Sequence, residues 1–318
     1  MNAFGFKPDI KIIDYLRQKH FTLSAEVIPP RNSAEQQNVL SQIEALIGAG
    51  AEFLSVTKGA GGSLRGGSLP IAQSIKERLG VPAIAHFTCR DLTPHEVENQ
   101  LMDHHYFGIR NILALRGDPP DDQPQWTPKS GAYEYAYQLI TQIKRLNQGE
   151  FFVRPSEKGA ANAEFSKPTQ TRTDFCIGCA VYPEHPVEEE RSRFFKLKVD
   201  AGAEYAITQM LFDPEAYARF LDLCGKHGLS IPVIPGSRLI KTRAMALRLA
   251  ERFHVSVPQA TIDALAEKDS PDAQKRSLEQ FLLMVEKFRS YGAPGVHVFV
   301  IVDGSGACQA LQRLAESN

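Results

Sequence analysis

The chain has 318 residues, of which 43% are hydrophobic and 23% are charged. This composition is typical of a folded globular protein and excludes a largely disordered or fibrous chain. The 36 basic and 37 acidic side chains nearly cancel, so we expect neither a nucleic-acid partner nor attraction to a membrane surface. Apolar runs such as Val296–Val302 are too short to span a bilayer. The five scattered cysteines and the absence of an apolar secretion signal predict a cytoplasmic protein.

Short apolar runs alternate with helical stretches along the chain. The runs expected to form strands are Phe21–Ile28, Ala51–Thr57, Val81–Thr88, Ile109–Leu115, Phe175–Val181, Tyr205–Gln209, Ile231–Ile234 and Val296–Val302. They lack polar alternation, as expected for parallel strands that are covered on both faces. Eight strands, each followed by helical sequence, predict an α/β fold, a single (β/α)8 barrel domain over residues 1–318. A doubly wound open sheet is the structural alternative.

Several segments qualify this plan. Ala34–Ile47 carries an apolar stripe typical of a helix that packs on a sheet. Thr93-Pro94 and Asp213-Pro214 have the residue types that begin helices. We also expect an additional N-terminal helix, a long polar insertion at Gly149–Thr173 before strand five, and a broken or doubled helix within Arg243–Glu286.

The active site of such a barrel lies at the C-terminal ends of its strands. Glu26 ends the first strand inside an apolar run, where burial would raise its pKa. It is therefore a candidate general acid, and the alternative is a core glutamate held in a salt bridge. The glycines from Gly59 to Gly62 suit a phosphate or simply a tight turn.

Polar residues also end the third, fourth and sixth strands. His86 is either a catalyst or a hydrogen-bonded core residue, and Arg116 with Asp118 is either functional or a structural pair. Gln209 can both donate to and accept from a heterocycle. Cys176 and Cys179 point to opposite faces of a strand, so we expect no metal site there. The residues alone leave an aldolase, a hydrolase and a redox enzyme open.

Eight segments resemble, in order, the motifs of the 5,10-methylenetetrahydrofolate reductases. They are Glu26–Pro30, Ser55–Gly62, His86–Cys89, Ala114–Pro119, Tyr182–Pro186, Asp200–Ala203, Thr208–Asp213 and Ile234–Gly236. The chain looks like the short bacterial form that contains the catalytic domain alone.

This resemblance implies a barrel that holds FAD, with NADH or NADPH as the electron donor and a folate as the substrate. Glu26 matches the acid that protonates N10 of the folate, and Asp118 matches the residue beside pterin and flavin. Gln209 matches a contact of the pterin or nicotinamide. The other positions that match flavin contacts are Thr57, His86, Leu115, Arg116, Gly117, Tyr135, Ala136, His185 and Lys198.

The sequence departs from the family pattern on the donor side. Lys58 replaces an aromatic residue, and Arg243 lies near the position of another aromatic that sandwiches the folate or nicotinamide. We therefore expect Arg243 to pair with an anionic group of one of these ligands. Arg191 stands where an acidic residue is usual near the flavin adenosine.

Three alternatives remain at this stage. One is a flavin-independent reductase with direct hydride transfer, and another is a non-catalytic folate-binding subunit. The third is a barrel aldolase, for which Lys58 is the only lysine placed to form a Schiff base. A homo-oligomer is compatible with the sequence.

Overall fold

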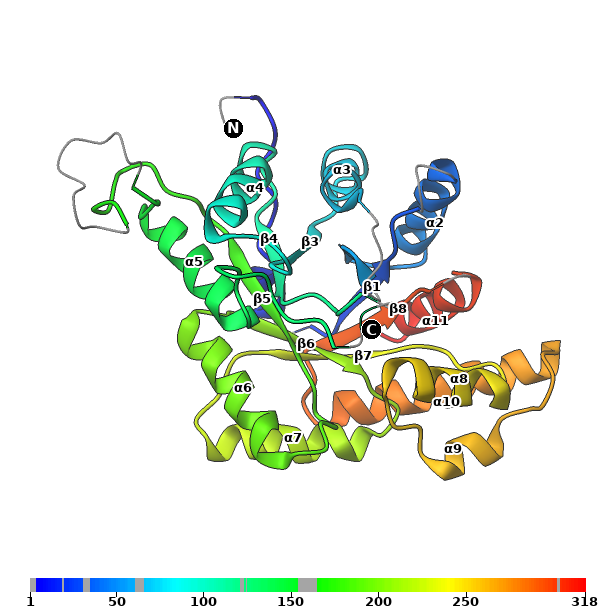
Figure 1. Cartoon of the computed structure of the whole chain (residues 1–318). Helices are drawn as coiled ribbons and strands as arrows, with labels where there is room; N and C mark the ends of the chain where they lie inside the picture. The colour runs from blue at the N-terminus through cyan, green and yellow to red at the C-terminus, as the bar shows by residue number, and fades with distance from the viewer. Residues whose placement is uncertain are drawn as a thin grey trace.

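Parallel strands close into a barrel in the computed structural model, with neighbours following chain order and β8 pairing with β1 (Figure 1). The structure describes residues 4–18, 20–30, 35–60, 66–120, 123, 125–153, 165–301 and 304–318. The strands are β1 (Thr22–Val27), β2 (Phe53–Val56), β3 (Ala83–Thr88), β4 (Asn111–Leu115), β5 (Cys176–Val181), β6 (Tyr205–Met210), β7 (Val233–Ser237) and β8 (Gly295–Phe299). The expected (β/α)8 barrel is confirmed, and the open doubly wound sheet is excluded.

Helices surround these strands (Figure 1). They are α1 (Ile12–Leu16), α2 (Gln36–Gly48), α3 (Ser68–Ser74) with its continuation η3 (Ile75–Leu79), α4 (Pro94–Tyr106), α5 (Ala136–Gln148), α6 (Glu188–Ala201), α7 (Pro214–Lys226), α8 (Arg243–Phe253), α9 (Gln259–Ala264), α10 (Pro271–Ser290) and α11 (Ser305–Glu316). The segment expected to hold a broken helix therefore contains α8, α9 and most of α10. No helix in the described part of the chain is long and apolar enough to cross a membrane.

The predicted helix starts are confirmed. The hydroxyl of Thr93 accepts from the backbone N–H of Glu96, whose side chain binds back to Thr93, while Pro94 opens α4. Asp213 likewise caps the N-terminal end of α7, where its side chain accepts a hydrogen bond from the backbone N–H of Glu215. Such caps satisfy backbone donors that the first turn leaves unpaired, so these local sequence signals fix where the helices begin.

The additional N-terminal helix closes the bottom of the barrel. Ile12, Ile13 and Leu16 of α1 pack with inward-facing residues such as Tyr205. The N–H of Ile12 donates to the side-chain oxygen of Asn111 at 2.9 Å, which ties α1 to the start of β4. With this end filled by side chains, the opposite, C-terminal end of the strands is where a ligand can enter.

The expected insertion before β5 is partly described. Residues 154–164 lie outside the described residues. On either side of them, Phe152 and Phe165 form an isolated antiparallel bridge, and their rings lie 4.6 Å apart. The two described parts of the insertion therefore lie next to each other beside α5 (Figure 1).

Candidate active site

Glu26 lies near the C-terminal end of β1 and faces the barrel interior. Its neighbours in register are Ser55 of β2 and Phe299 of β8. The side chain is only 15% exposed, and this burial raises the pKa of Glu26 to about 8. At neutral pH the carboxyl group therefore retains its proton, as a general acid requires.

His86 faces Glu26 across the barrel mouth. Its Nε2 lies 3.5 Å from Oε2 of Glu26, and its side chain is 7% exposed. Burial lowers the pKa of His86 to about 3, so the imidazole is neutral. Within the described part of the chain, Nε2 has no hydrogen-bond partner. The two groups form a neutral acid beside a neutral ring, and the alternative of Glu26 held in a core salt bridge is not what the structure shows.

His297 of β8, which the sequence analysis did not name as a site residue, lies one layer of barrel side chains below Glu26. Its Nδ1 is 2.8 Å from the hydroxyl of Ser24, and its Nε2 is 3.0 Å from the hydroxyl of Ser55. The ring is fully buried. This burial, with His86 nearby, lowers the pKa of His297 to about 3. The signal available in the sequence was one histidine inside the apolar run of the last strand.

Arg116, Gly117 and Asp118 form the rim after β4. Gly117 has φ of +98°, and a Cβ there would lie 2.9 Å from Cβ of Arg90. The Arg90 guanidinium donates to the carbonyl of Asp118, which folds the loop tightly onto the end of β3. The Arg116 and Asp118 side chains are both exposed. The loop therefore presents one cation and one carboxylate at the barrel mouth.

Lys198 supplies a second cation on the same side. It comes from α6 and donates to the carbonyl of Ala180 on β5 at 2.7 Å. Burial lowers the pKa of Lys198, the Cys179 thiol opposes that shift, and the positive charge of Arg116 lowers it further. Lys198 is thus held against the backbone of β5, while Arg116 is exposed after β4.

The remaining residues that match flavin contacts follow β2, β4 and β5 or lie at the start of α5. Thr57 follows β2 and is buried, and Leu115 ends β4. Tyr135 stacks on Phe194 of α6 with centroids 5.7 Å apart, directly before Ala136 begins α5. His185 follows β5, with its Nε2 3.6 Å from Glu190.

Gln209 lies on β6, the strand beside β5, where the pairing of β6 and β7 is irregular. Its side-chain oxygen accepts from the N–H of Met210 at 2.9 Å. The hydroxyl of Thr208 accepts from Gly236 N–H and donates to the Gln209 carbonyl. Because the side-chain oxygen is engaged, a ligand would meet the NH2 group of Gln209.

Two basic residues that the sequence analysis discussed have protein partners in the structure. Lys58 donates to Gln100 of α4 and lies 4.5 Å from the ring centre of Phe87, so it points into the outer layer rather than the mouth. This removes the lysine that an aldolase would need. Arg243 pairs with Asp263 at 2.7 Å and Glu267 at 3.2 Å instead of facing a ligand, because α9 brings these carboxylates to it.

Other features of the sequence proved structural or fall outside the description. Cys176 lies in the barrel interior and Cys179 in the outer core, and both are free thiols. Among the described residues, no group of three or more potential ligands could hold a metal ion. Gly61 and Gly62 of the glycine-rich loop lie outside the described residues.

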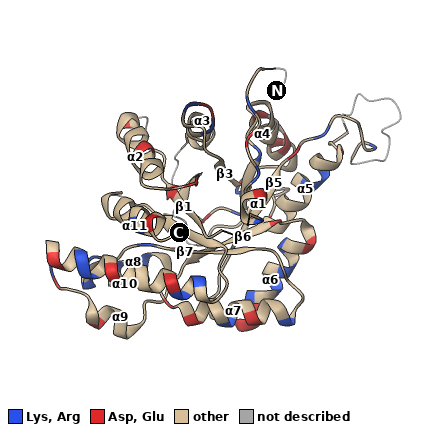
Figure 2. Ribbon diagram, turned by 180° about the vertical axis from the view of Figure 1, so that it is seen from behind, with Lys and Arg blue, Asp and Glu red and all other residues tan. Residues whose placement is uncertain are grey.

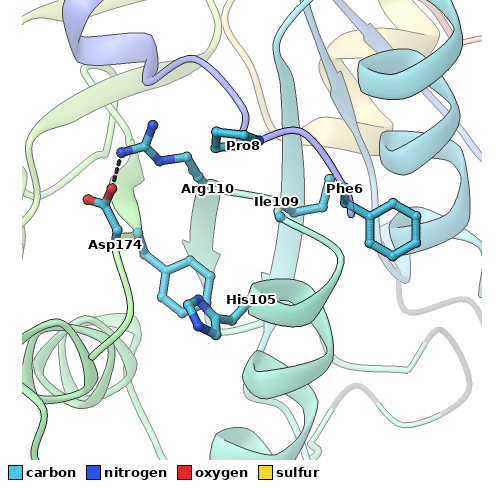
Figure 3. Close-up of a pocket in the computed structure, with 8 residues that line it drawn as sticks. Phe6, Pro8, His105, Ile109, Arg110 and Asp174 are labelled. Atoms are coloured by element: carbon cyan, nitrogen blue, oxygen red, sulfur yellow. Dashed lines mark hydrogen bonds and ion pairs between the residues drawn. The ribbon is translucent and has the colours of Figure 1, made fainter. Parts of the chain in front are cut away.

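One cavity, drawn in Figure 3, lies beside the N-terminal ends of β4 and β5, away from the strand end that holds Glu26. It has a volume of about 280 Å3, and its lining includes Phe6, His105, Arg110 and Asp174. Arg110 and Asp174 form an ion pair there. These residues lie beside the starts of β4 and β5, so this cavity belongs to the closed end and not to the candidate active site.

Comparisons with known proteins agree with this arrangement. A family model described as methylenetetrahydrofolate reductase matches residues 11–314. The 5,10-methylenetetrahydrofolate reductase of Escherichia coli (strain K12) is 33% identical over 287 residues, covering 89% of this chain and 86% of that protein. Methylenetetrahydrofolate reductase (NADH) 1 of Arabidopsis thaliana is 27% identical over 313 residues, covering 96% of this chain and 51% of that protein.

A solved structure shares the fold. It is an uncharacterized protein from Clostridium thermocellum that binds two copies of 5-methyl-5,6,7,8-tetrahydrofolic acid. It aligns with a TM-score of 0.58 at 15% identity and covers 96% of this chain and 97% of its own. Because the family model spans nearly the whole barrel and the Escherichia coli relative is 33% identical over most of both chains, the chain belongs to the methylenetetrahydrofolate reductase family, a family of oxidoreductases.

Proposed function

We propose that this protein reduces 5,10-methylenetetrahydrofolate to 5-methyltetrahydrofolate, with hydride from NADH or NADPH passing through FAD. The observation that carries the proposal is the carboxyl group of Glu26, which is buried at the open end of the barrel beside His86 and whose pKa burial raises to about 8. Family membership supports the reaction, and the folate bound by the Clostridium thermocellum protein supports a folate ligand for this fold. The name of the Arabidopsis relative supports a nicotinamide donor.

The residues around the mouth fit a flavin dinucleotide. His86 offers a buried ring nitrogen without a described partner, suited to a polar ligand edge. The cations of Arg116 after β4 and Lys198 of α6 would serve the phosphates of such a cofactor. Thr57, Leu115, Gly117, Tyr135, Ala136 and His185 would supply further contacts. The chemistry supplied there is hydride transfer between the nicotinamide and the folate.

Glu26 provides the proton for the folate. It protonates N10, so that the five-membered ring opens and leaves an iminium whose methylene carbon accepts the hydride. A pKa of about 8 keeps this proton available at neutral pH. The carboxylate that remains lies 3.5 Å from the His86 ring and regains a proton from solvent before the next turnover.

Asp118 and Gln209 bind and orient the substrate. The exposed carboxylate of Asp118 is placed at the rim to hold the pterin and to stabilise the positive iminium. The NH2 group of Gln209 donates to the pterin or to the nicotinamide. These three residues together favour a catalyst over a non-catalytic folate-binding subunit, since binding alone needs no buried acid.

An absorption spectrum of the purified protein tests the cofactor. We expect a bound-flavin band that bleaches under anaerobic conditions with NADH or NADPH and recovers when methylenetetrahydrofolate is added. A colourless protein that still oxidises the nicotinamide with the folate would establish the flavin-independent alternative instead. A protein that binds folate without any turnover would contradict the enzymatic assignment.

The cellular role follows from the reaction. We propose that residues 1–318 act as one catalytic domain in the cytoplasm and make the methyl donor for methionine synthesis. Five free thiols are compatible with such a reducing compartment. The partners are the folate and the nicotinamide donor, and size measurement in solution would decide between a monomer and a homo-oligomer.

A further inference from the structure

A network of three polar side chains lies beneath Glu26 in the barrel interior. The ring of His297 on β8 joins the hydroxyls of Ser24 on β1 and Ser55 on β2, at 2.8 Å from Nδ1 and 3.0 Å from Nε2. All three side chains are buried. Figure 2 shows Lys, Arg, Asp and Glu residues gathered on the helices around the barrel. The candidate acid therefore lies above a buried, uncharged network to which the proposed reaction assigns no role.

His297 contacts the neighbours of Glu26 on both sides. Ser55 is the register partner of Glu26 on β2, and Phe299 is its register partner on β8. The His297 ring is hydrogen-bonded to Ser55 and lies edge-on to Phe299, with ring centroids 5.6 Å apart. Ser24, the third contact, precedes Glu26 by two residues and so faces the same side of β1. His297 can therefore influence Glu26 through the side chains that adjoin it.

The hydrogen-bond partners determine the direction of each bond in this network. The Ser24 hydroxyl donates its single hydrogen to the carbonyl of Val296 at 3.1 Å. It can therefore only accept from His297, whose Nδ1 must carry the ring hydrogen. Burial lowers the pKa of His297 to about 3, so the ring is neutral and its Nε2 has a free lone pair. Nε2 accordingly accepts the hydroxyl hydrogen of Ser55.

The orientation of the Ser55 hydroxyl matters for the neighbouring carboxyl group. A hydroxyl that donates to a carboxylate stabilises its ionised form, whereas a hydroxyl that presents only lone pairs does not. Because the hydrogen of Ser55 lies toward His297, lone pairs remain on the side of Glu26. We propose that His297 is a positioning residue for the acid, which holds the Ser55 hydroxyl in the orientation that keeps Glu26 protonated. This inference rests on the proposed function, because it takes Glu26 as the proton donor.

The other titratable groups near Glu26 leave room for this effect. His86 on β3 contacts Glu26, but burial lowers the pKa of His86 to about 3, so its ring is uncharged at neutral pH. Arg116 and Asp118 are exposed at the rim, where solvent and salt weaken their influence. Burial is the cause of the raised pKa of Glu26. A hydrogen bond donated to its carboxylate would oppose that effect and lower the pKa.

Infrared titration of the Glu26 carboxyl group tests the inference. Its C=O band, assigned by its loss in Glu26→Gln, should have a midpoint of about pH 8 in wild type. His297→Leu removes the acceptor, so the Ser55 hydroxyl can turn toward the carboxylate. The midpoint should then fall by about one pH unit, a tenfold change in the ionisation equilibrium. His297→Phe also removes the acceptor and should repeat this shift, whereas His297→Gln keeps an acceptor and should shift the midpoint less.

A second substitution separates this effect from a loss of packing. When Ser55→Ala is added to His297→Leu, no hydroxyl remains to donate, so the midpoint should return toward the wild-type value. A packing role predicts the opposite, because a second truncation would admit more water to the carboxyl group. The matched control is His104→Leu, since His104 is a buried histidine of α4 whose Nδ1 lies 2.7 Å from the carbonyl of Gln100. It should leave the midpoint of Glu26 unchanged.

Folate reduction provides the kinetic readout. Because the acid must be protonated, the rate falls as the pH rises through its pKa, and this fall should occur about one pH unit lower in His297→Leu. An unchanged infrared midpoint in His297→Leu and His297→Phe, or a lowered midpoint that Ser55→Ala does not restore, would overturn the inference. The titration needs no turnover. A protein that does not reduce the folate would therefore refute the proposed reaction, while the titration would still decide the role of His297.

Discussion

Replacing Glu26 with glutamine should stabilise the protein at neutral pH while nearly abolishing folate reduction. Burial raises the pKa of Glu26 from its ordinary value of 4.5 to about 8. Between these values the folded protein holds a proton that the unfolded chain has released, so the free energy of unfolding falls as the pH rises. From pH 4.5 to pH 7, at about 1.4 kcal/mol per pH unit, this cost has an upper limit of roughly 3 kcal/mol.

Glutamine keeps the shape of the side chain and has no proton to lose. We therefore expect Glu26→Gln to be about 1–3 kcal/mol more stable than wild type at pH 7 to 8, with the difference vanishing near pH 4.5. Urea unfolding across this pH range measures the difference, in which the contributions of other titrating groups cancel. Glu279→Gln on the exposed face of α10 is the control and should show no such pH dependence.

The same variant separates the two half-reactions. Flavin content and reduction by the nicotinamide should change little, whereas folate reduction should slow by about a hundred- to ten-thousand-fold, the usual contribution of a general acid. Stopped-flow spectroscopy measures each step. Equal slowing of both steps, or a stability difference that does not vary with pH, would refute a protonated Glu26 acting as the acid.

Four further variants test other parts of the site. Asp118→Asn should slow folate reduction more than it reduces flavin retention on purification, and loss of the flavin would point to a scaffold role. Arg243→Ala should leave both substrate KM values unchanged and lower stability by about 0.5 kcal/mol in urea unfolding, because its partners are exposed carboxylates. His297→Gln should cost about 1–2 kcal/mol at pH 7 through weaker bonds to the serine hydroxyls. That deficit should shrink toward pH 5. The folded-state pKa of His297 lies below its ordinary value of 6.5, so below pH 6.5 the unfolded wild-type chain binds a proton that the folded protein does not bind. The free energy of unfolding of wild type therefore falls toward acid pH, whereas the glutamine variant has no such loss at this position. Lys58→Met should retain folate turnover, and borohydride should trap no Schiff base on wild type.

Much of the fold could be predicted because its signals are local. Caps such as Thr93 and Asp213 act within one turn of their helices, and parallel barrel strands are apolar on both faces. The burial of Glu26 was predictable for the same reason. A carboxyl group inside an apolar run of sequence is unusual, and this signal does not depend on the exact residue at which the strand ends. The strand alternation also placed Cys176 and Cys179 on opposite faces correctly.

What escaped prediction depends on contacts between distant segments. Arg243 is paired by Asp263 and Glu267, which only the fold of α9 brings near it. The His297 ring is hydrogen-bonded to serine hydroxyls on β1 and β2, which lie more than two hundred residues earlier in the chain. Arg238, which follows β7, lines one cavity together with Arg248 and Arg252 of α8. Spacing along the chain carries no information about these encounters.

The effect of burial on neighbouring groups supports the proposal that Glu26 is the acid. Desolvation disfavours charge, so it raises the pKa of a carboxyl group and lowers that of an imidazole. Both His86 and His297 are therefore neutral at pH 7 and hold no acidic proton. Asp9, with a pKa raised to about 7, is buried beside β3 at the closed end of the barrel. Of these four buried groups, Glu26 alone combines a pKa raised to near neutrality with a position at the open end of the barrel, which is why we propose Glu26 as the proton donor.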